Sequence, residues 1–189
     1  LGPRRGHRRV SVGPWRTLRG QVPTVGTFAD LRNTEGRTNG LVYLVGYEEA
    51  GDGGQGLFLW DDSEATGDDA GVIAGSINGR WVRQVDGAVN VKWWGAKGDN
   101  VTDDTDAIQA AIDYLGSAGG EVYLPTGVYK ITGTGLAIGM DGPVNSVTLR
   151  GEVPCGYNAL ERLVVDGVIP DVGTMLRFAG SGGVGALLE

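Results

Sequence analysis

The chain has 189 residues, and its 41% hydrophobic and 21% charged residues are the composition of a globular protein. Its single cysteine, Cys155, and single histidine, His7, exclude an intrachain disulfide, a CxxC metal site, histidine-based triads and HExxH zinc sites. No apolar run approaches the roughly 18 residues of a membrane-spanning helix, and the basic start lacks the apolar core of a signal peptide. We therefore expect neither a membrane protein nor a visible secretion signal.

Charge is distributed unevenly along the chain. The first twenty residues contain no acid but six arginines, which are Arg4, Arg5, Arg8, Arg9, Arg16 and Arg19. The remainder holds ten basic and 23 acidic residues, a net charge of −13. A body this acidic repels nucleic acid, whereas the basic arm of residues 1–20 can either dock on an acidic partner surface or stay solvated.

The segment from Val22 to Asp86 predicts a small antiparallel β-module. Thr27 to Leu31 can form one helical turn, and the acidic stretch from Asp61 to Gly71 is expected to be a loop. Short β-rich runs alternate with glycine-rich turns. These runs are Leu41–Val45, Leu57–Trp60, Val72–Ala74 and Arg80–Arg83.

One amphipathic helix of about three turns follows this module. Its apolar stripe has helical spacing and consists of Ile108, Ala111, Ile112 and Leu115. Thr102 or Asp103 can supply the N-cap. Asp104 and Asp106 then lie in the first turn, where negative charge meets the positive end of the helix dipole. Gly116 fits the C-terminal stop, so a helix with one buried face is predicted to cover an apolar surface.

Strand-sized runs recur after this helix at irregular spacing. They are Glu121–Leu124, Val128–Ile131, Ser146–Leu149, Thr174–Phe178 and Val184–Leu188. Repeated short strands without a second helix indicate a sandwich, a barrel or a β-solenoid. The unequal loops favour the solenoid, because its corners tolerate insertions.

The region around the helix resembles the N-terminal signature of the pectate-lyase-like superfamily, found at the entry to the β-helix of many phage tailspikes and secreted polysaccharide-degrading enzymes. The matching motifs are Trp93–Asp99, Thr102–Thr105, Ala107–Ile112, Gly119–Pro125 and Gly127–Tyr129. The resemblance implies that the helix caps the open N-terminal end of a right-handed parallel β-helix.

The preceding module resembles the small domain that often comes just before the β-helix in tailspikes. The motifs are Val42–Tyr47, Gly51–Asp61 and Gly79–Val82. This pairing favours a phage protein over a plain secreted lyase. The resemblance also implies a homotrimer, with any enzyme site on later rungs or between subunits.

Two segments, Gly51–Gly56 and Gly180–Gly185, fit the pattern G-x-G-x-x-G. A dinucleotide site needs such a turn to open a helix whose N-terminus faces the pyrophosphate. The first segment precedes a strand and the second lies at the end of the chain, so neither is interpreted as a nucleotide site. The sequence has no P-loop either.

Three groups of side chains are weighed as sites. Asp99, Asp103, Asp104 and Asp106 could hold calcium, but their spacing departs from the EF-hand and helix capping is favoured. The pairs Asp61 with Asp62 and Asp68 with Asp69 could serve glycoside hydrolysis, but adjacent acids in a glycine-rich loop are usually solvated. Aromatic rings could stack on sugars, although burial or subunit contact is favoured; these are Trp60, Trp81, Trp93 and Trp94.

The sequence thus predicts a mainly β chain in three parts: a basic arm (1–20), an anchoring module (21–87), and a helix-capped start of a right-handed β-helix (88–189). No catalytic, cofactor-binding or metal-binding residue is assigned. The expected function is virion attachment of a tailspike that binds or degrades host polysaccharide, as a homotrimer in contact with other tail proteins. The alternative is a fragment of a secreted bacterial polysaccharide lyase or hydrolase whose catalytic rungs are missing.

Overall fold

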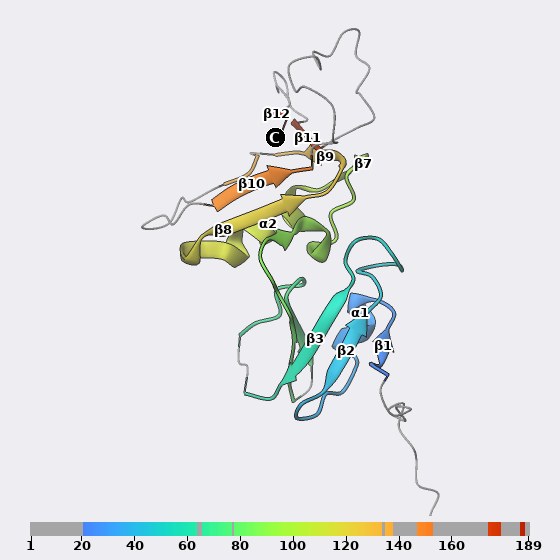
Figure 1. Ribbon diagram of the computed structural model, residues 1–189. Helices are drawn as coiled ribbons and strands as arrows, with labels where there is room; N and C mark the ends of the chain where they lie inside the picture. The colour runs from blue at the N-terminus through green and yellow to red at the C-terminus, as the bar shows by residue number, and fades with distance from the viewer. Residues whose placement is uncertain are drawn as a thin grey trace, which may run out of the picture.

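The computed structural model describes residues 21–63, 66–76, 78–133, 135–137, 147–152, 174–178 and 186–187. The described part is mainly β (Figure 1). A small sheet comes first, and a second part with two mainly parallel sheets and one longer helix follows it. The whole basic arm with His7, Cys155 and the segment Gly180–Gly185 lie outside the described residues. No helix in the described ranges is both long and apolar enough to cross a membrane.

The small sheet has the strand order β1-β2-β3-β5-β4, and all its pairings are antiparallel except β1 with β2. Its elements are β1 (Thr24–Val25), α1 (Phe28–Arg32), β2 (Leu41–Leu44), β3 (Gly56–Asp61), β4 (Ile73–Ser76) and β5 (Gly79–Arg83). The helix starts with a capping box, because Thr27 and Asp30 each bond the other's backbone N–H. The predicted antiparallel module and its helical turn are therefore confirmed.

Alternation along the strands gives the small sheet one buried face. On β3, Phe58 and Trp60 are buried while Leu57 and Leu59 are exposed. The buried side chains form one core with Phe28 and Leu31 of α1, and that core is completed by Val42, Leu44, Ala74 and Trp81. The helix α1 therefore covers one face of the sheet, and the other face carries the exposed residues (Figure 1).

The second part contains two parallel sheets, ordered β10-β8-β6 and β12-β11-β9-β7. The strands are β6 (Val89–Asn90), β7 (Asp99–Asp103), β8 (Gly120–Leu124), β9 (Gly127–Ile131), β10 (Val147–Gly151), β11 (Thr174–Phe178) and β12 (Ala186–Leu187). Consecutive strands β8 and β9 lie in different sheets, and each pairs in parallel with a later strand. β12 instead pairs antiparallel with β11, so the last run does not continue the parallel stacking.

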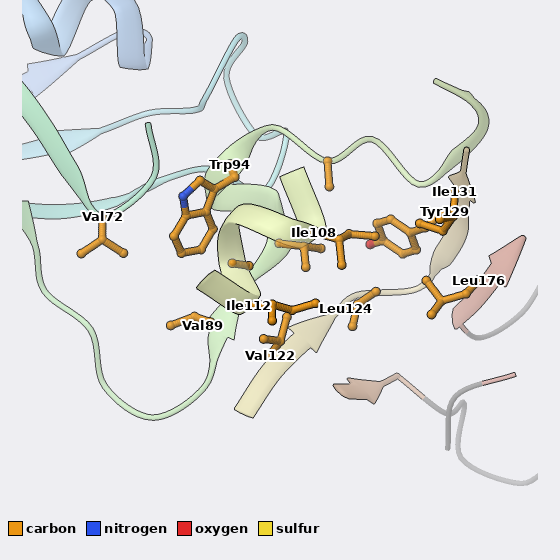
Figure 2. Packing of buried hydrophobic residues seen from close by; sticks show 13 residues of the cluster. Val72, Val89, Trp94, Ile108, Ile112, Val122, Leu124, Tyr129, Ile131 and Leu176 are labelled. Carbon is orange, nitrogen blue, oxygen red and sulfur yellow. The ribbon is translucent and has the colours of Figure 1, made fainter. Parts of the chain in front are cut away.

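The predicted helix is α2 (Thr105–Leu115), and its apolar stripe is confirmed. Ile108, Ala111 and Ile112 are buried in a core that includes Val122 and Leu124 of β8 (Figure 2). This core holds the helix against the parallel sheets, on the side of β8 that faces the small sheet (Figure 1).

The predicted N-terminus of this helix is wrong by one to two residues. The helix begins at Thr105 and Asp104 occupies the N-cap position without a side-chain capping bond. Asp103 instead accepts from the backbone N–H of Thr105 at 3.1 Å, outside the helix. Asp106 in the first turn and Gly116 at the C-terminal stop are as predicted. Asp104 does not cap the helix with its side chain, because its carboxylate accepts from the backbone N–H groups of Lys97 and Gly98.

Candidate functional site

The exposed face of the small sheet carries a row of apolar side chains, here called the outer stripe. Its members are Leu41, Tyr43, Leu57, Leu59 and Val82. The strand register places Tyr43 opposite Leu57, and Leu59 opposite both Leu41 and Val82. Leu57 is 41% exposed and Leu59 39% exposed. Adjacent apolar residues on a solvent face are typical of a contact surface.

The turn that contains Gly51–Gly56 is closed by an internal carboxylate. Asp52 accepts hydrogen bonds from the backbone N–H groups of Tyr47, Glu48, Glu49 and Gly54, at 2.7 to 3.1 Å. A phosphate bound in a glycine-rich turn would need such N–H groups. Here they are bonded to the protein's own anion, and the chain continues into β3 rather than a helix. The rejection of a nucleotide site thus has a geometric basis.

The Asp52→Asn variant is expected to lose about 1 kcal/mol of the free energy of unfolding at pH 7, because an amide nitrogen would face N–H donors. Partial burial alone would raise the pKa of Asp52, but the four donors outweigh it and lower the pKa. Its contribution is therefore complete above the ordinary carboxyl pKa of about 4 and is lost as the pH falls below that value. Urea unfolding from pH 7 to pH 3 measures the effect.

The control for this variant is Asp86→Asn, which changes an exposed aspartate on the same module. The difference between Asp52→Asn and the unchanged chain should shrink at low pH, whereas the control should match the unchanged chain at pH 7. A deficit of Asp52→Asn that stays constant down to pH 3 would show that the charge of this carboxylate does not stabilise the turn.

Three of the four paired carboxylates, those of Asp61, Asp68 and Asp69, hold loops by accepting from backbone N–H groups, whereas Asp62 accepts from the hydroxyl of Thr38 at 3.2 Å. Asp68 forms a bidentate pair with Arg32, with both N–O distances at 2.7 Å, and also accepts from the N–H of Gly75. Asp69 accepts from three successive N–H groups, those of residues 71, 72 and 73, with one oxygen. Asp61 accepts from Ser63. These contacts indicate that the carboxylates stabilise their own loops.

Three of the four aspartates near α2, which are Asp99, Asp103 and Asp104, have separate structural partners. Asp99 accepts from the N–H groups of residues 101 and 102. Asp104 is 1% exposed and accepts from Lys97 N at 2.6 Å and Gly98 N at 3.0 Å. Burial raises the pKa of Asp104 although both N–H donors lower it. Helix capping therefore explains Asp106 but not Asp104, whose carboxylate closes the turn before β7. Among the described residues, no group of three or more acidic, cysteine or histidine side chains is arranged to hold a metal ion.

The four tryptophans that follow the basic arm are packed into the protein to different degrees. Trp60, Trp81 and Trp94 are buried, with Trp81 only 1% exposed. Trp93 and Trp94 lie in the 3-10 helix η1 (Val91–Trp94), so the two are not extended and do not point to opposite faces as a strand would require. The ring centroid of Trp94 lies 5.7 Å from that of Tyr114 on α2. The three buried rings are therefore not available to stack on sugars.

One buried cation, Arg83, has a structural role that the sequence did not predict. Arg83 is 3% exposed and donates to the carbonyl oxygens of Gly54, Gln55 and Gly71. Burial lowers its pKa to about 9, and the charge of Asp69 opposes that shift. Its position two residues after Trp81 on the same strand was the available signal, because residues i and i+2 share a face. An arginine at such a position is more often read as exposed.

Two family models match the chain in succession. Residues 24–86 match the phage tail protein small four-stranded beta-sheet domain. Residues 88–138 match the rhamnogalacturonase A/epimerase, pectate lyase-like family. The boundary between the matches coincides with the passage from the small sheet to β6.

Curated relatives are similar to parts of the chain. Alginate lyase 7 of Azotobacter vinelandii is 67% identical over 45 residues, covering 23% of this chain and 5% of the relative. Mannuronan C5-epimerase AlgE1 of the same organism is 42% identical over 94 residues, which cover 48% of this chain and 6% of the relative. The capsule K2-specific depolymerase of Klebsiella phage vB_KpnP_KpV74 is 30% identical over 116 residues, which cover 60% of this chain and 20% of the relative. The chain spans a fifth or less of the length of these relatives.

Solved structures of tailspike-like proteins also resemble the chain, at 26% and 29% sequence identity. The Pantoea stewartii enzyme WceF, which has a tailspike-like parallel β-helix fold, is 26% identical with a TM-score of 0.53, covering 59% of this chain and 17% of the other. The tailspike of Acinetobacter baumannii phage AM24 is 29% identical with a TM-score of 0.50, covering 63% and 20%. The chain therefore carries a phage tail β-sheet domain followed directly by a pectate-lyase-like region, and its structural neighbours are tailspike-like proteins.

Proposed function

We propose that this chain attaches a tailspike to the virion and supports a polysaccharide-binding or polysaccharide-degrading β-helix. The observation that carries the proposal is the order of the two parts, a phage tail β-sheet domain leading directly into a pectate-lyase-like start. The similarity to a capsule depolymerase of a Klebsiella phage supports a role toward host polysaccharide. The location in this proposal is the tail of the virion.

The second part is the beginning of a right-handed parallel β-helix, with α2 as the cap of its open end. Parallel pairing of β8 with β10 and of β9 with β11 supports this arrangement, because each pair joins strands separated by a long intervening segment. The apolar face of α2 on the core of β8 supports the cap. The three parts are then the arm (1–20), the module (21–87) and the β-helix start (88–189).

Catalysis belongs to later rungs of the parent protein in this proposal. Glycosidases need two carboxylates across a sugar site, and lyases need a base beside a group that neutralises the uronate. The four candidate carboxylates already bond groups of the protein itself: Asp61, Asp68 and Asp69 accept from backbone N–H groups, and Asp62 accepts from the hydroxyl of Thr38. Similarity to lyases and epimerases of Azotobacter vinelandii keeps the secreted bacterial enzyme as the alternative.

A homotrimer is part of the proposal, and the outer stripe supports it. The stripe is apolar, and the charged residues at its end, Asp61 and Arg80, oppose each other across β3 and β5. A chain with an acidic body repels its own copies, so association requires a face without excess acid. Three-fold symmetry allows identical chains to bury such faces around one axis. Light scattering on the full-length parent gives its mass, and a monomer at micromolar concentration would contradict the trimer.

Deleting residues 1–19 from the full-length parent is expected to reduce its incorporation into phage particles severely. Six arginines can form charge-assisted hydrogen bonds with an acidic surface of a neighbouring tail protein. Quantitative immunoblotting of purified particles measures the incorporation, and circular dichroism of the truncated protein checks that the remainder is folded. A matched control replaces the six arginines by lysine, which keeps the charge.

Normal incorporation of the truncated protein would show that the arm is only a solvated tail. If the truncated and the lysine-substituted proteins both fail, the fork geometry of arginine is needed as well as the charge. Incorporation that survives loss of both the arm and the small sheet would reject virion attachment as the function of this chain.

A further inference from the structure

The small sheet and the β-helix start share a packed boundary that begins at Trp94. This indole is 6% exposed and donates from Nε1 to the carbonyl oxygen of Asp69 at 2.9 Å. Gly71 lies so close beneath the ring that a Cβ there would come within 2.2 Å of Cε2. Val72, which comes from the small domain, is 2% exposed and belongs to the same core as Ile108 of α2 (Figure 2). One apolar core thus includes residues from both parts.

A buried cation crosses the same boundary a short distance away. The guanidinium carbon of Arg83, on β5, lies 4.5 Å from the ring centroid of Phe58 and 4.7 Å from that of Trp93. Phe58 belongs to the core of the small sheet and Trp93 to η1 of the second part. The three carbonyl oxygens that accept from Arg83, at 2.8 to 3.0 Å, belong to the small domain. Removing Trp93 would expose a cation that is otherwise stacked between two rings.

Further contacts lie along the edge of this boundary. A Cβ at Gly95 would approach Tyr47 Cε1 to 2.5 Å, and a Cβ at Gly53 would approach the stem of Lys92 to 2.8 Å. At each place the backbone of one part therefore packs against a side chain of the other without room for a methyl group. Lys97 forms an ion pair with Glu48, which is exposed and contributes little by itself.

From these contacts we infer that the small β-sheet domain has a second function: together with α2 it closes the apolar end of the parallel sheets, and the two parts fold as one cooperative unit. The helix covers the middle of this end, and Val72 with the loop of residues 69–71 covers Trp94 at its margin. Separation of the two parts would expose Trp94 and Val72 to water together and remove one of the two rings that enclose Arg83. This function is distinct from virion attachment.

The cooperative unit has a mechanical consequence. A domain joined by a flexible linker reorients freely, whereas domains that share a core have one relative orientation. The direction of the β-helix is then fixed relative to the small sheet by side-chain packing rather than by the loop between β5 and β6.

Hydrogen exchange of the whole chain, followed by mass spectrometry, tests the inference with two substitutions on opposite sides of the boundary. Gly71→Ala, in the small domain, is expected to speed exchange of the slowest amides of α2 and β8 on the order of tenfold, as well as those of β3 and β5. Trp93→Leu, in the second part, should reciprocally speed exchange in β3 and β5, because linkage in one unit acts in both directions. Trp93 is half-buried, so this milder variant decides if Gly71→Ala does not fold.

Gly67→Ala is the matched control, since a Cβ at that glycine has no neighbour within 4 Å. It should leave exchange in both parts unchanged. Loss of protection confined to residues 24–86 in Gly71→Ala, or to residues 88–133 in Trp93→Leu, would overturn the inference and show two independent domains. The measurement requires no virion, so its failure and a failure of virion attachment are separate results.

Discussion

The Ile112→Asp variant is expected to lose about 4 kcal/mol or more of the free energy of unfolding, or to be insoluble. Ile112 is 4% exposed and lies in the core that joins α2 to β8. A carboxylate there loses its hydration, and the neighbours in this cluster are apolar. Losses of that size come from a short list of causes, of which a buried unpaired charge is one. Urea unfolding monitored by circular dichroism measures the change.

Val101→Asp is the matched control, because Val101 is 74% exposed and belongs to the same part of the chain. Its free energy of unfolding should remain within about 0.5 kcal/mol of the unchanged chain. Unchanged unfolding of Ile112→Asp would remove the cap hypothesis, since a helix whose buried face tolerates a charge is not covering an apolar surface.

Trp81→Ala is expected to cost about 3 to 5 kcal/mol, the range for truncating a buried tryptophan. Its ring packs edge-on against Trp60 at 5.2 Å between centroids, and Nε1 donates to the carbonyl oxygen of Thr34 at 2.9 Å. Truncation opens a cavity and removes one of the two donors to that carbonyl oxygen, the other being the hydroxyl of Ser76 at 3.1 Å. Thermal and urea unfolding both report the loss.

Two further variants separate the causes at this position. Trp81→Phe keeps most of the apolar volume but removes the N–H group, so it should lose clearly less than Trp81→Ala. Val85→Ala changes an exposed residue that follows β5 and should have nearly no effect. If Trp81→Ala unfolded like Val85→Ala, the small sheet would not depend on the core around Trp81.

Local sequence patterns were enough to predict most strands and the main helix. Leu41–Val45 and Leu57–Trp60 alternate, and the structure places β2 and β3 there within one or two residues. Thr174–Phe178 coincides with β11. The stripe of α2 was found because its spacing of three and four residues is independent of its surroundings. Each of these signals depends on which side of a single element is buried.

Features that depend on contacts between distant residues could not be predicted in this way. Asp104 looked like a residue of the first helical turn, but its carboxylate bonds the turn at Lys97 and Gly98. Arg83 is stacked on a ring from another part of the chain. Trp93 and Trp94 looked like continuation of a strand, yet Asn90 caps a 3-10 helix there by accepting from Lys92 N. In each case the deciding partner lies in a turn or in a different element.

The loop of Asp68 and Asp69 has a consequence for how other chains can approach the small sheet. β4 is an outer strand, and its N–H groups at Ile73 and Gly75 are bonded to these carboxylates at 2.7 and 2.8 Å. The carbonyl oxygen of Ile73 is bonded to the N–H of Asp69 as well. An outer strand with free backbone groups would invite strand-by-strand growth with a neighbouring molecule. Here that edge is sealed by the protein's own loop, which protects it from strand pairing with another copy of the chain.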